Sequence, residues 1–322
     1  MRRRHLLVLA AAALAAGPLS GTAASAAEWP ERPVKLIVPY GPGGASDILA
    51  RPWAELLTKA FGQQFIVENR GGAAGMIGTE AAYKAAPDGY TLLFTPNATL
   101  TVLPTLRQTP YDPAKFEPVA RTGDLITGFV IHPSVGVKSI PELIDYAKKN
   151  PGKLVYGSAG LGSATQLRVE ALKLKAGIDI LHIPYRGSAD ALNDLLPGTI
   201  QMMNEINGLP HVKAGKLILL NINHTSRHPD FPDVPTLTEV GIKDADVPIW
   251  YSIWGPPGLP KDIAAKLNQK VVEIAKTDDM KKRMRALNSE VPLQTPDEVR
   301  AYRETDTARN AEIIKAANIK LE

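Results

Sequence analysis

The sequence predicts an α/β protein with two lobes. From residue 34 almost to the C-terminus, short apolar runs rich in β-branched residues alternate with helical patterns, as in parallel sheets whose strands are joined by helices. The chain has 322 residues, which exceeds the usual limit of about 250 to 300 residues for one hydrophobic core. No Gly/Ser-rich linker separates the halves. We therefore expect the chain to cross between the lobes more than once.

Residues 1–27 have the features of a cleaved signal peptide. Three arginines at positions 2–4 precede an apolar stretch over residues 6–16, and small residues at 24–27 provide a cleavage site. The stretch is shorter than the roughly 20 apolar residues of a transmembrane helix. We expect a mature periplasmic chain, exported by the general or the twin-arginine route, and without a lipid anchor because it has no cysteine.

Composition excludes several classes of function. The formal net charge of +4 includes the three arginines of the signal peptide. The mature chain is therefore almost neutral, and nucleic acid is not an expected partner. With 0 Cys, the chain has no disulfide, thiolate zinc site or cysteine nucleophile. The histidines are scattered, and His224 and His228 lie in a stretch that contains proline. No metal site and no cofactor are expected.

Residues 28–125 together with 251–322 are predicted to form the first lobe. Strands are expected at 34–39, 65–68 and 91–94, and the helices between them at 46–61 and 76–85. Pro52 falls inside the first helix, which should therefore begin late or kink. From residue 262 onward the pattern is helical. The run TPDE at 295–298 supplies an N-cap, a proline at the first position and a capping-box acid for a terminal helix.

Residues 126–250 are predicted to form the second lobe. A helix beginning after Ser139 has apolar residues at 140, 143, 144 and 147 on one face, with Glu142 placed for a capping box. The candidate crossings between the lobes lie near residues 121–129 and 247–254. Strands are expected at 126–131, 154–157, 180–183, 200–203 and 217–222.

Three segments share one design, in which an apolar strand leads through a Gly- or Ser-containing turn into a helix. They cover residues 38–47, 156–165 and 183–190. A helix N-terminus presents unpaired N–H groups and about half a positive charge, and glycine lets an anion approach them. Any single loop of this kind can instead be capped by its own Ser, Thr or Asp. Three of them at the carboxyl ends of strands, in both lobes, favour a carboxylate site.

Several motifs in this chain resemble those of Bug-type solute receptors, the extracytoplasmic binding proteins of tripartite tricarboxylate transporters. They are PYGPGGASD at 39–47, VENRGGA at 67–73, APDGYTLL at 86–93, YGS at 156–158, HIPYRG at 182–187 and KAGK at 213–216. The resemblance covers essentially the whole mature chain. It implies a periplasmic-binding-protein (Venus flytrap, type II-like) fold and a monomer that binds a small organic acid between its lobes. It also implies delivery to membrane permease subunits without chemical change.

The resemblance also implies which residues bind the ligand, through backbone amides and hydroxyls at helix starts. Two departures from the family pattern concern the second lobe: the run MMNE at 202–205 stands where MMFD is common, and the loop after it is about two residues shorter. The predicted ligand-binding residues are Tyr40, Gly43, Gly44, Ala45, Ser46, Asp47, Asn97, Ala98, Thr99, Ser158, Gly162, Ser163, Ala164, Thr165, Tyr185, Arg186, Gly187, Ser188, Glu205 and Trp250.

Some of these side chains have a structural interpretation of equal weight. Asp47 can orient a ligand or simply favour the helix dipole. Arg186 can pair with a second carboxylate or stay solvated in a turn. Glu205 can accept a ligand donor or lie at the rim. Aromatic side chains can wall the ligand or pack in the core: Tyr40, Trp250 and Tyr251.

Other functions fit the sequence less well. Residues 41–44 imitate a dinucleotide-binding fingerprint, but the third glycine is missing and Pro42 interrupts the turn. The run GSAG at 157–160 lacks the spacing of a serine-hydrolase elbow. A sensory receptor with a signalling partner stays open as the alternative. The ligand is expected to be a di- or tricarboxylate, while aromatic and amino acid carboxylates stay open.

Overall fold

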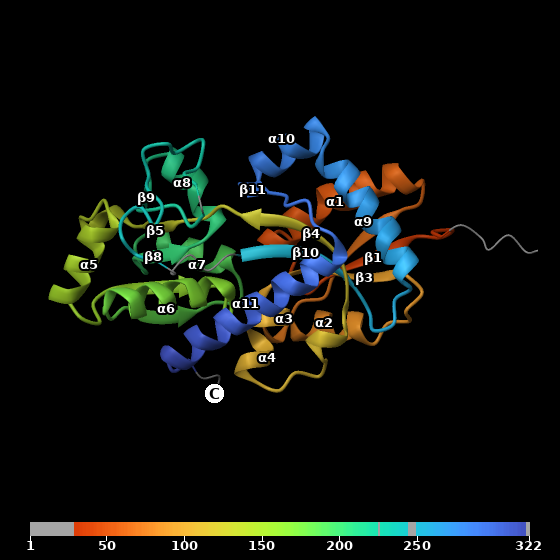
Figure 1. Cartoon of the computed structure of the whole chain (residues 1–322). Coiled ribbons are helices and arrows are strands. Elements are labelled where there is room, and N and C mark those ends of the chain that lie inside the picture. The colour runs from red at the N-terminus through yellow and green to blue at the C-terminus, as the bar shows by residue number, and fades with distance from the viewer. Residues whose placement is uncertain (1–28, 225, 244–248, 320–322) are drawn as a thin grey trace, which may run out of the picture.

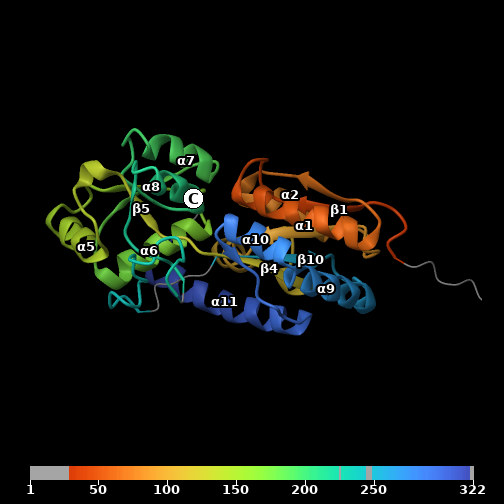
Figure 2. The same cartoon turned by 90° about the horizontal axis from the view of Figure 1, so that it is seen from above.

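The computed structural model describes residues 29–224, 226–243 and 249–319. The predicted signal peptide therefore lies outside the described residues. Figures 1 and 2 show two lobes side by side, with helix α11 (Pro296–Ala316) running from one toward the other. Each lobe contains one sheet with helices around it, as the sequence predicts.

The sheet of the first lobe has six strands in the order β11-β4-β10-β3-β1-β2. Strand β1 pairs in parallel with β2 and β3, whereas β10 is antiparallel to both β3 and β4. The sheet is therefore mixed, not wholly parallel as the alternating pattern suggested. Its strands are β1 (Val34–Val38), β2 (Phe65–Asn69), β3 (Thr91–Pro96), β4 (Glu117–Leu125), β10 (Ile249–Gly255) and β11 (Ser289–Glu290).

The sheet of the second lobe has five strands in the order β7-β6-β8-β5-β9. Strand β6 pairs in parallel with β7 and β8, and β5 is antiparallel to β8 and β9. Strand β8 is thus the central one, and the chain leaves it at Glu205. The strands are β5 (Phe129–Ile131), β6 (Val155–Ser158), β7 (Leu181–Pro184), β8 (Met202–Asn204) and β9 (Ile218–Leu219).

Helices are present at the places predicted for them, and the short helices α3 and α4 after β3 were not predicted. The remaining α-helices are α1 (Ala45–Phe61), α2 (Met76–Tyr83), α3 (Ala98–Thr101), α4 (Leu103–Leu106), α5 (Ile140–Lys149), α6 (Ala164–Ala176), α7 (Ser188–Leu195), α8 (Leu209–Lys213), α9 (Lys261–Ala275) and α10 (Asp278–Ala286). Short 3₁₀ turns cover Ala73–Gly75, Pro113–Lys115, Pro133–Val135 and Ile206–Gly208.

Helices α1 and α11 show how local sequence sets these elements. Helix α1 buries Leu49, Trp53 and Leu57, which recur every four residues, and ends at Gly62 in the left-handed conformation. It runs through Pro52 without a break, so the expected late start is wrong. Helix α11 begins with the predicted capping box at Thr295.

Each lobe has its own core. The first is built around side chains such as Trp53 and Phe94, and the second around Phe129 and Tyr156. Strand β4 of the first sheet runs almost directly into β5 of the second, and an isolated bridge joins Thr127 to Asn223 between them. The chain therefore passes from the first sheet to the second near residues 125–129, and the division into 28–125 with 251–322 and 126–250 stays a prediction.

The junction between the lobes contains a buried polar network. The side chain of Arg168, on α6, is fully buried and donates to Thr127 Oγ1 and, at 3.1 Å, to Asn204 Oδ1. Asn204 Nδ2 in turn donates to Asn223 Oδ1 at 2.7 Å. Helix α11 packs against β4 and α3 in the first lobe and against α6 in the second. Besides the crossing strands, a buried polar network and a long helix therefore connect the two lobes.

Candidate functional site

A cavity of about 400 Å³ lies between the two lobes. The β1–α1 loop and the ends of β3 and β10 line it from the first lobe, and the starts of α6 and α7 and the end of β8 line it from the second. All three predicted loops therefore meet at one place. The predicted residues that line it are Tyr40, Gly43, Gly44, Ala45, Ser46, Ala98, Ser163, Ala164, Thr165, Arg186, Gly187, Ser188 and Glu205.

Helix α1 presents an uncapped N-terminus to this cavity. Its N-cap is Gly44, which has no side chain to accept a hydrogen bond. Asp47 is buried, and its Oδ2 accepts from the Gly43 N–H at 2.9 Å and from Arg51. Burial alone raises the pKa of the Asp47 carboxyl, but the hydrogen bonds from Arg51 and Gly43 outweigh burial and hold this pKa below its usual value. Asp47 is not among the lining residues; it fixes the loop instead.

Helix α7 presents a second uncapped N-terminus from the opposite lobe. Its N-cap, Gly187, again makes no side-chain cap. A Cβ atom added at Gly187 would meet no heavy atom within 4 Å, so the space in front of this backbone is open. The first turn of α7 therefore offers backbone N–H groups to a ligand that enters the cavity.

The N-terminus of α6 is capped by its own side chains. Ser163 Oγ accepts from the Gln166 N–H at 3.2 Å, and Thr165 Oγ1 accepts from the Ala159 N–H at 3.1 Å. The Gly162 N–H, also predicted to bind ligand, donates to Gln166 Oε1 at 2.7 Å and is not part of the lining. The hydroxyls of this loop are thus engaged in shaping it.

Ser158 and His182 form a pair that sequence reasoning missed. Ser158 Oγ lies 2.7 Å from His182 Nε2, and the imidazole stacks on Tyr156 with 4.6 Å between ring centroids. Burial lowers the pKa of His182 to about 4, so the ring is neutral near neutral pH. Ser158 is 0% exposed and neither residue lines the cavity. The pair holds the β6–α6 turn, where Ser158 Oγ also accepts from the Gly160 N–H at 3.1 Å.

Asn97, Thr99 and Trp250 also lie behind the cavity surface. The Trp250 side chain is buried, and its Nε1 donates to Asp306 Oδ2 of α11 at 3.1 Å. Asn97 Nδ2 donates to the same oxygen at 2.8 Å. Thr99 Oγ1 lies 2.8 Å from Thr95 Oγ1. These side chains support the backbone of the β3–α3 turn, whose neighbours Pro96 and Ala98 do line the cavity.

Further residues line the cavity, some of them within the predicted segments 38–47, 156–165 and 183–190 and others outside them. They are Gly41, Pro42, Pro96, Leu125, Ala159, Ala189, Asp190, Ile249 and Tyr251. Tyr251 had been weighed as a wall residue. Leu125 and Ile249 are apolar residues at the ends of the crossing strands. Their residue types do not distinguish a side chain that lines a cavity from one that packs in the hydrophobic core.

A second hollow of about 610 Å³ continues from the cavity and shares Tyr40 and Arg186 with it. Its lining also includes the glycine-rich loop at 71–75, Arg107 and the predicted Tyr185. The Tyr185 hydroxyl donates to Asp194 Oδ2 at 2.7 Å. Two arginines thus border this hollow.

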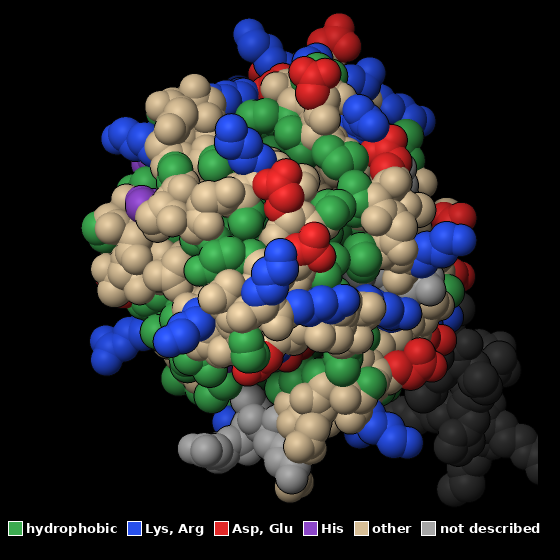
Figure 3. Space-filling view, turned by 90° about the vertical axis from the view of Figure 1, so that its left-hand side faces the viewer, with side chains coloured by type: hydrophobic (Ala, Val, Ile, Leu, Met, Phe, Trp, Pro, Cys, Tyr) green, Lys and Arg blue, Asp and Glu red, His purple; other side chains and the backbone are tan. Residues whose placement is uncertain are grey.

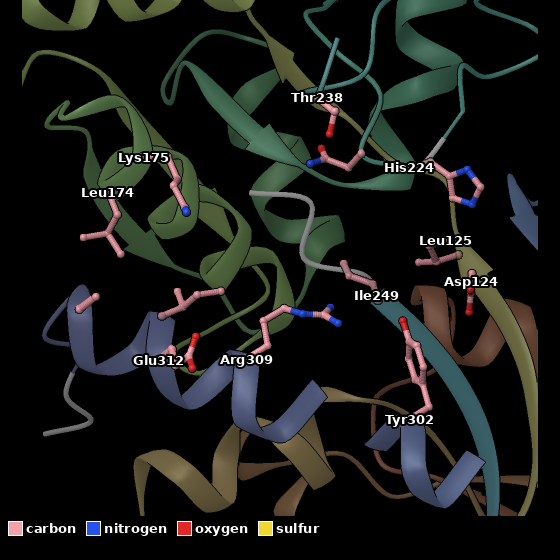
Figure 4. Close-up of a pocket in the computed structure, with 13 residues that line it drawn as sticks. Asp124, Leu125, Leu174, Lys175, His224, Thr238, Ile249, Tyr302, Arg309 and Glu312 are labelled. Atoms are coloured by element: carbon pink, nitrogen blue, oxygen red, sulfur yellow. The ribbon is translucent and has the colours of Figure 1, made fainter. Parts of the chain in front are cut away.

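A larger cavity, of about 1030 Å³, lies elsewhere (Figure 4). Its labelled side chains include Arg309 and Glu312 of α11, Lys175 at the end of α6 and Asp124 of the crossing strand β4. Its lining includes no start of a helix and no glycine turn. The smaller cavity is therefore the better candidate for an anion site. Within the described ranges, no group of three or more His, Cys, Asp or Glu side chains is placed to hold a metal.

The outer face of the second lobe carries basic and acidic side chains interspersed (Figure 3). No helix in the described part of the chain is long and apolar enough to cross a bilayer.

The fold and the cavity together define a two-lobed solute-binding protein. The chain belongs to the TctC family, the tripartite tricarboxylate transporter family receptors, whose model matches residues 49–319. It is 33% identical over 307 residues to protein BugT of Bordetella pertussis, which covers 92% of this chain and 93% of BugT. The family predicted from the sequence motifs is therefore confirmed.

Solved structures confirm the periplasmic-binding-protein fold. The periplasmic binding protein BugD matches with a TM-score of 0.83 at 33% identity, covering 91% of this chain and 100% of BugD. An R. palustris protein solved with adipate matches with a TM-score of 0.85 at 32% identity, over 91% of this chain and 99% of that one. MatC from Rhodopseudomonas palustris with bound malate matches with a TM-score of 0.82 at 28% identity, over 88% and 99%.

Proposed function

We propose that this chain is a periplasmic receptor that captures a small organic acid by a carboxylate group and delivers it to the permease of a tripartite transporter. The observation that carries the proposal is a pair of helices, α1 and α7, whose N-cap residue is a glycine without a capping side chain. Their first turns reach one cavity from opposite lobes. Each supplies N–H groups that no side chain caps, and about half a positive charge. The adipate and malate of the related structures are carboxylates of this kind.

The ligand is released unchanged. The described residues include a serine–histidine pair, Ser158 and His182, but neither atom of the pair reaches the cavity lining. A carboxylate held by backbone N–H groups from both lobes makes its full set of contacts only when the lobes are closed. Binding therefore shifts the population toward a closed form, and that form docks on the permease.

A thermal-shift screen of the purified protein against organic acids tests the carboxylate site. An acid present at 100 times its Kd should stabilise the fold by about 2.7 kcal/mol, and solution scattering should show a more compact molecule. Failure of every organic acid to stabilise the protein would refute the proposal. Uptake assays in a strain without the permease subunits test delivery. Uptake should be lost there although the receptor still binds; persistent uptake would favour the sensory alternative.

A further inference from the structure

A hollow of about 470 Å³ lies outside the ligand cavity, where α10 and β11 of the first lobe face the second lobe. Figures 1 and 2 both show α10 at the edge of the first lobe that is nearest to the second. This hollow, called here the α10 hollow, shares no described lining residue with the ligand cavity. Binding of an organic acid between the lobes therefore does not account for it.

Both lobes build the walls of the α10 hollow. Met284 of α10 belongs to the core of the first lobe, and β11 pairs with β4 in the first sheet. The opposite wall includes His228, whose ring lies 5.4 Å from that of Phe231, and Phe231 packs against the second lobe. The two walls therefore change their separation whenever the lobes open or close.

The floor of the α10 hollow is apolar. Met284 is 2% exposed and Ile126 is 5% exposed. The partly buried Val291 continues this surface to Leu293, which lies at the rim with 52% of its side chain exposed. An apolar side chain that enters here would bury its own surface and that of Leu293, which is favourable in proportion to the area removed from water.

The rim of the α10 hollow has an excess of positive charge. The described charged residues that line it are three cations and one anion: Lys276, Lys281, Arg285 and Glu290. Lys281 lies 3.8 Å from an Asp278 oxygen and Arg285 lies 3.7 Å from an Asp230 oxygen, and both distances exceed those of a hydrogen bond. These cations therefore keep N–H donors for a partner, and carboxylates are the groups that suit them.

We propose that the α10 hollow is a docking surface for an acidic segment of the permease. Carboxylates of that segment pair with Lys281 and Arg285, while an apolar side chain next to them packs on Leu293 and the floor. The inference rests on the proposed function, which supplies the partner. Because the walls belong to different lobes, the fit of the segment depends on the separation of the lobes. The permease therefore distinguishes the closed receptor from the open one at this surface.

Surface plasmon resonance with the permease subunits in lipid nanodiscs tests the proposal. The analyte is the full mature chain, saturated with the organic acid that gives the largest shift in the thermal-shift screen. The double charge reversal K281E/R285E should weaken binding to the permease at least tenfold, and L293D should weaken it at least threefold. Wild-type affinity should also fall severalfold when NaCl is raised from about 50 to 300 mM, because salt screens exposed charges.

Matched control variants separate this surface from general effects of charge and polarity. K148E/K149E makes the same change of charge on exposed side chains at the end of α5, which lies at the far end of the second lobe (Figure 1). L181D alters a leucine on β7 that is 50% exposed, like Leu293. Both controls should change permease affinity less than twofold. All four variants should bind the acid as the wild type does, since none of their substituted residues lines the ligand cavity.

The outcomes separate this inference from the proposed function. Permease affinity that neither K281E/R285E nor L293D lowers would overturn the docking surface while the receptor stands. The same holds if decanoate stabilises the wild type but not K281E/R285E and permease affinity is equal in the two, because the hollow would then be a site for a small amphipathic anion. Failure of the acid-saturated wild type to bind the permease would overturn both. If K281E/R285E does not fold, L293D decides.

Discussion

Replacing Asp306 by alanine should destabilise the protein more than any other change considered for this chain. Asp306 is 0% exposed, and its Oδ2 accepts from Asn97 Nδ2 at 2.8 Å, Thr101 Oγ1 at 2.9 Å, Trp250 Nε1 at 3.1 Å and Asn310 Nδ2 at 3.1 Å. These donors are all buried. Alanine would leave them without this acceptor in a place that water does not reach.

The size of the effect follows from the cost of unpaired buried donors. A buried polar group that loses its partner costs about 1 to 3 kcal/mol, and such costs are not additive within one network. We expect D306A to lose about 3 to 5 kcal/mol of unfolding free energy. This is a large part of the total of about 5 to 15 kcal/mol typical of globular domains.

Urea unfolding followed by tryptophan fluorescence measures this loss, with the midpoint and slope both fitted. D297A, on the exposed first turn of the same helix, is the control and should lose less than about 1 kcal/mol. Ligand affinity should fall in D306A as well, because Asn97 lies in the turn between two lining residues, Pro96 and Ala98. A loss of unfolding free energy no larger in D306A than in D297A would refute this reasoning.

Three further changes have defined outcomes. Gly187→Val should weaken ligand binding at least tenfold in calorimetry with an unchanged melting temperature, because the added side chain enters the open space before α7; unchanged affinity would mean that the ligand lies elsewhere. Because the folded pKa of His182 lies at about 4, below its usual 6.5, the unfolded chain takes up the proton first, and stability should fall as pH drops from 6.5 to 4. His182→Gln, which can still bond Ser158, should lessen that fall in stability when unfolding free energies from urea titrations at pH 7 and pH 4.5 are compared. A difference between the two pH values as large as in the wild type would contradict this prediction. Thr295→Ala should cost about 0.5 to 2 kcal/mol in thermal unfolding through loss of the capping box with Glu298, and no loss would show that the cap is redundant.

Sequence reasoning recovered the elements that carry strong local signals. Strand β1, helix α1 and the glycine turn between them follow from apolar alternation and from Gly43, which adopts a positive φ. The terminal helix follows from its capping box at Thr295. Strands β4 and β11 were not predicted, since β4 carries charged residues such as Arg121, which bonds Asp124, and β11 has only two residues.

The parts of the candidate site that consist of backbone N–H groups could be predicted from the sequence. The parts that depend on contacts between residues distant in the sequence could not. The loops at α1 and α7 were found because glycine before a helix is visible in the sequence. The role of Asn97 was not, since its partner Asp306 lies 209 residues away. The same holds for Ser158 and His182, which are 24 residues apart and meet only through the pairing of β6 with β7.

Leu125 and Ile249 line both the ligand cavity and the larger cavity of Figure 4. These two side chains, on the crossing strands β4 and β10, therefore separate the two cavities. A solute that contacts them in one cavity contacts side chains that also line the other. A dye attached at Glu312, in the larger chamber, would sense occupancy without touching the solute. The receptor thus already has the layout of an optical biosensor.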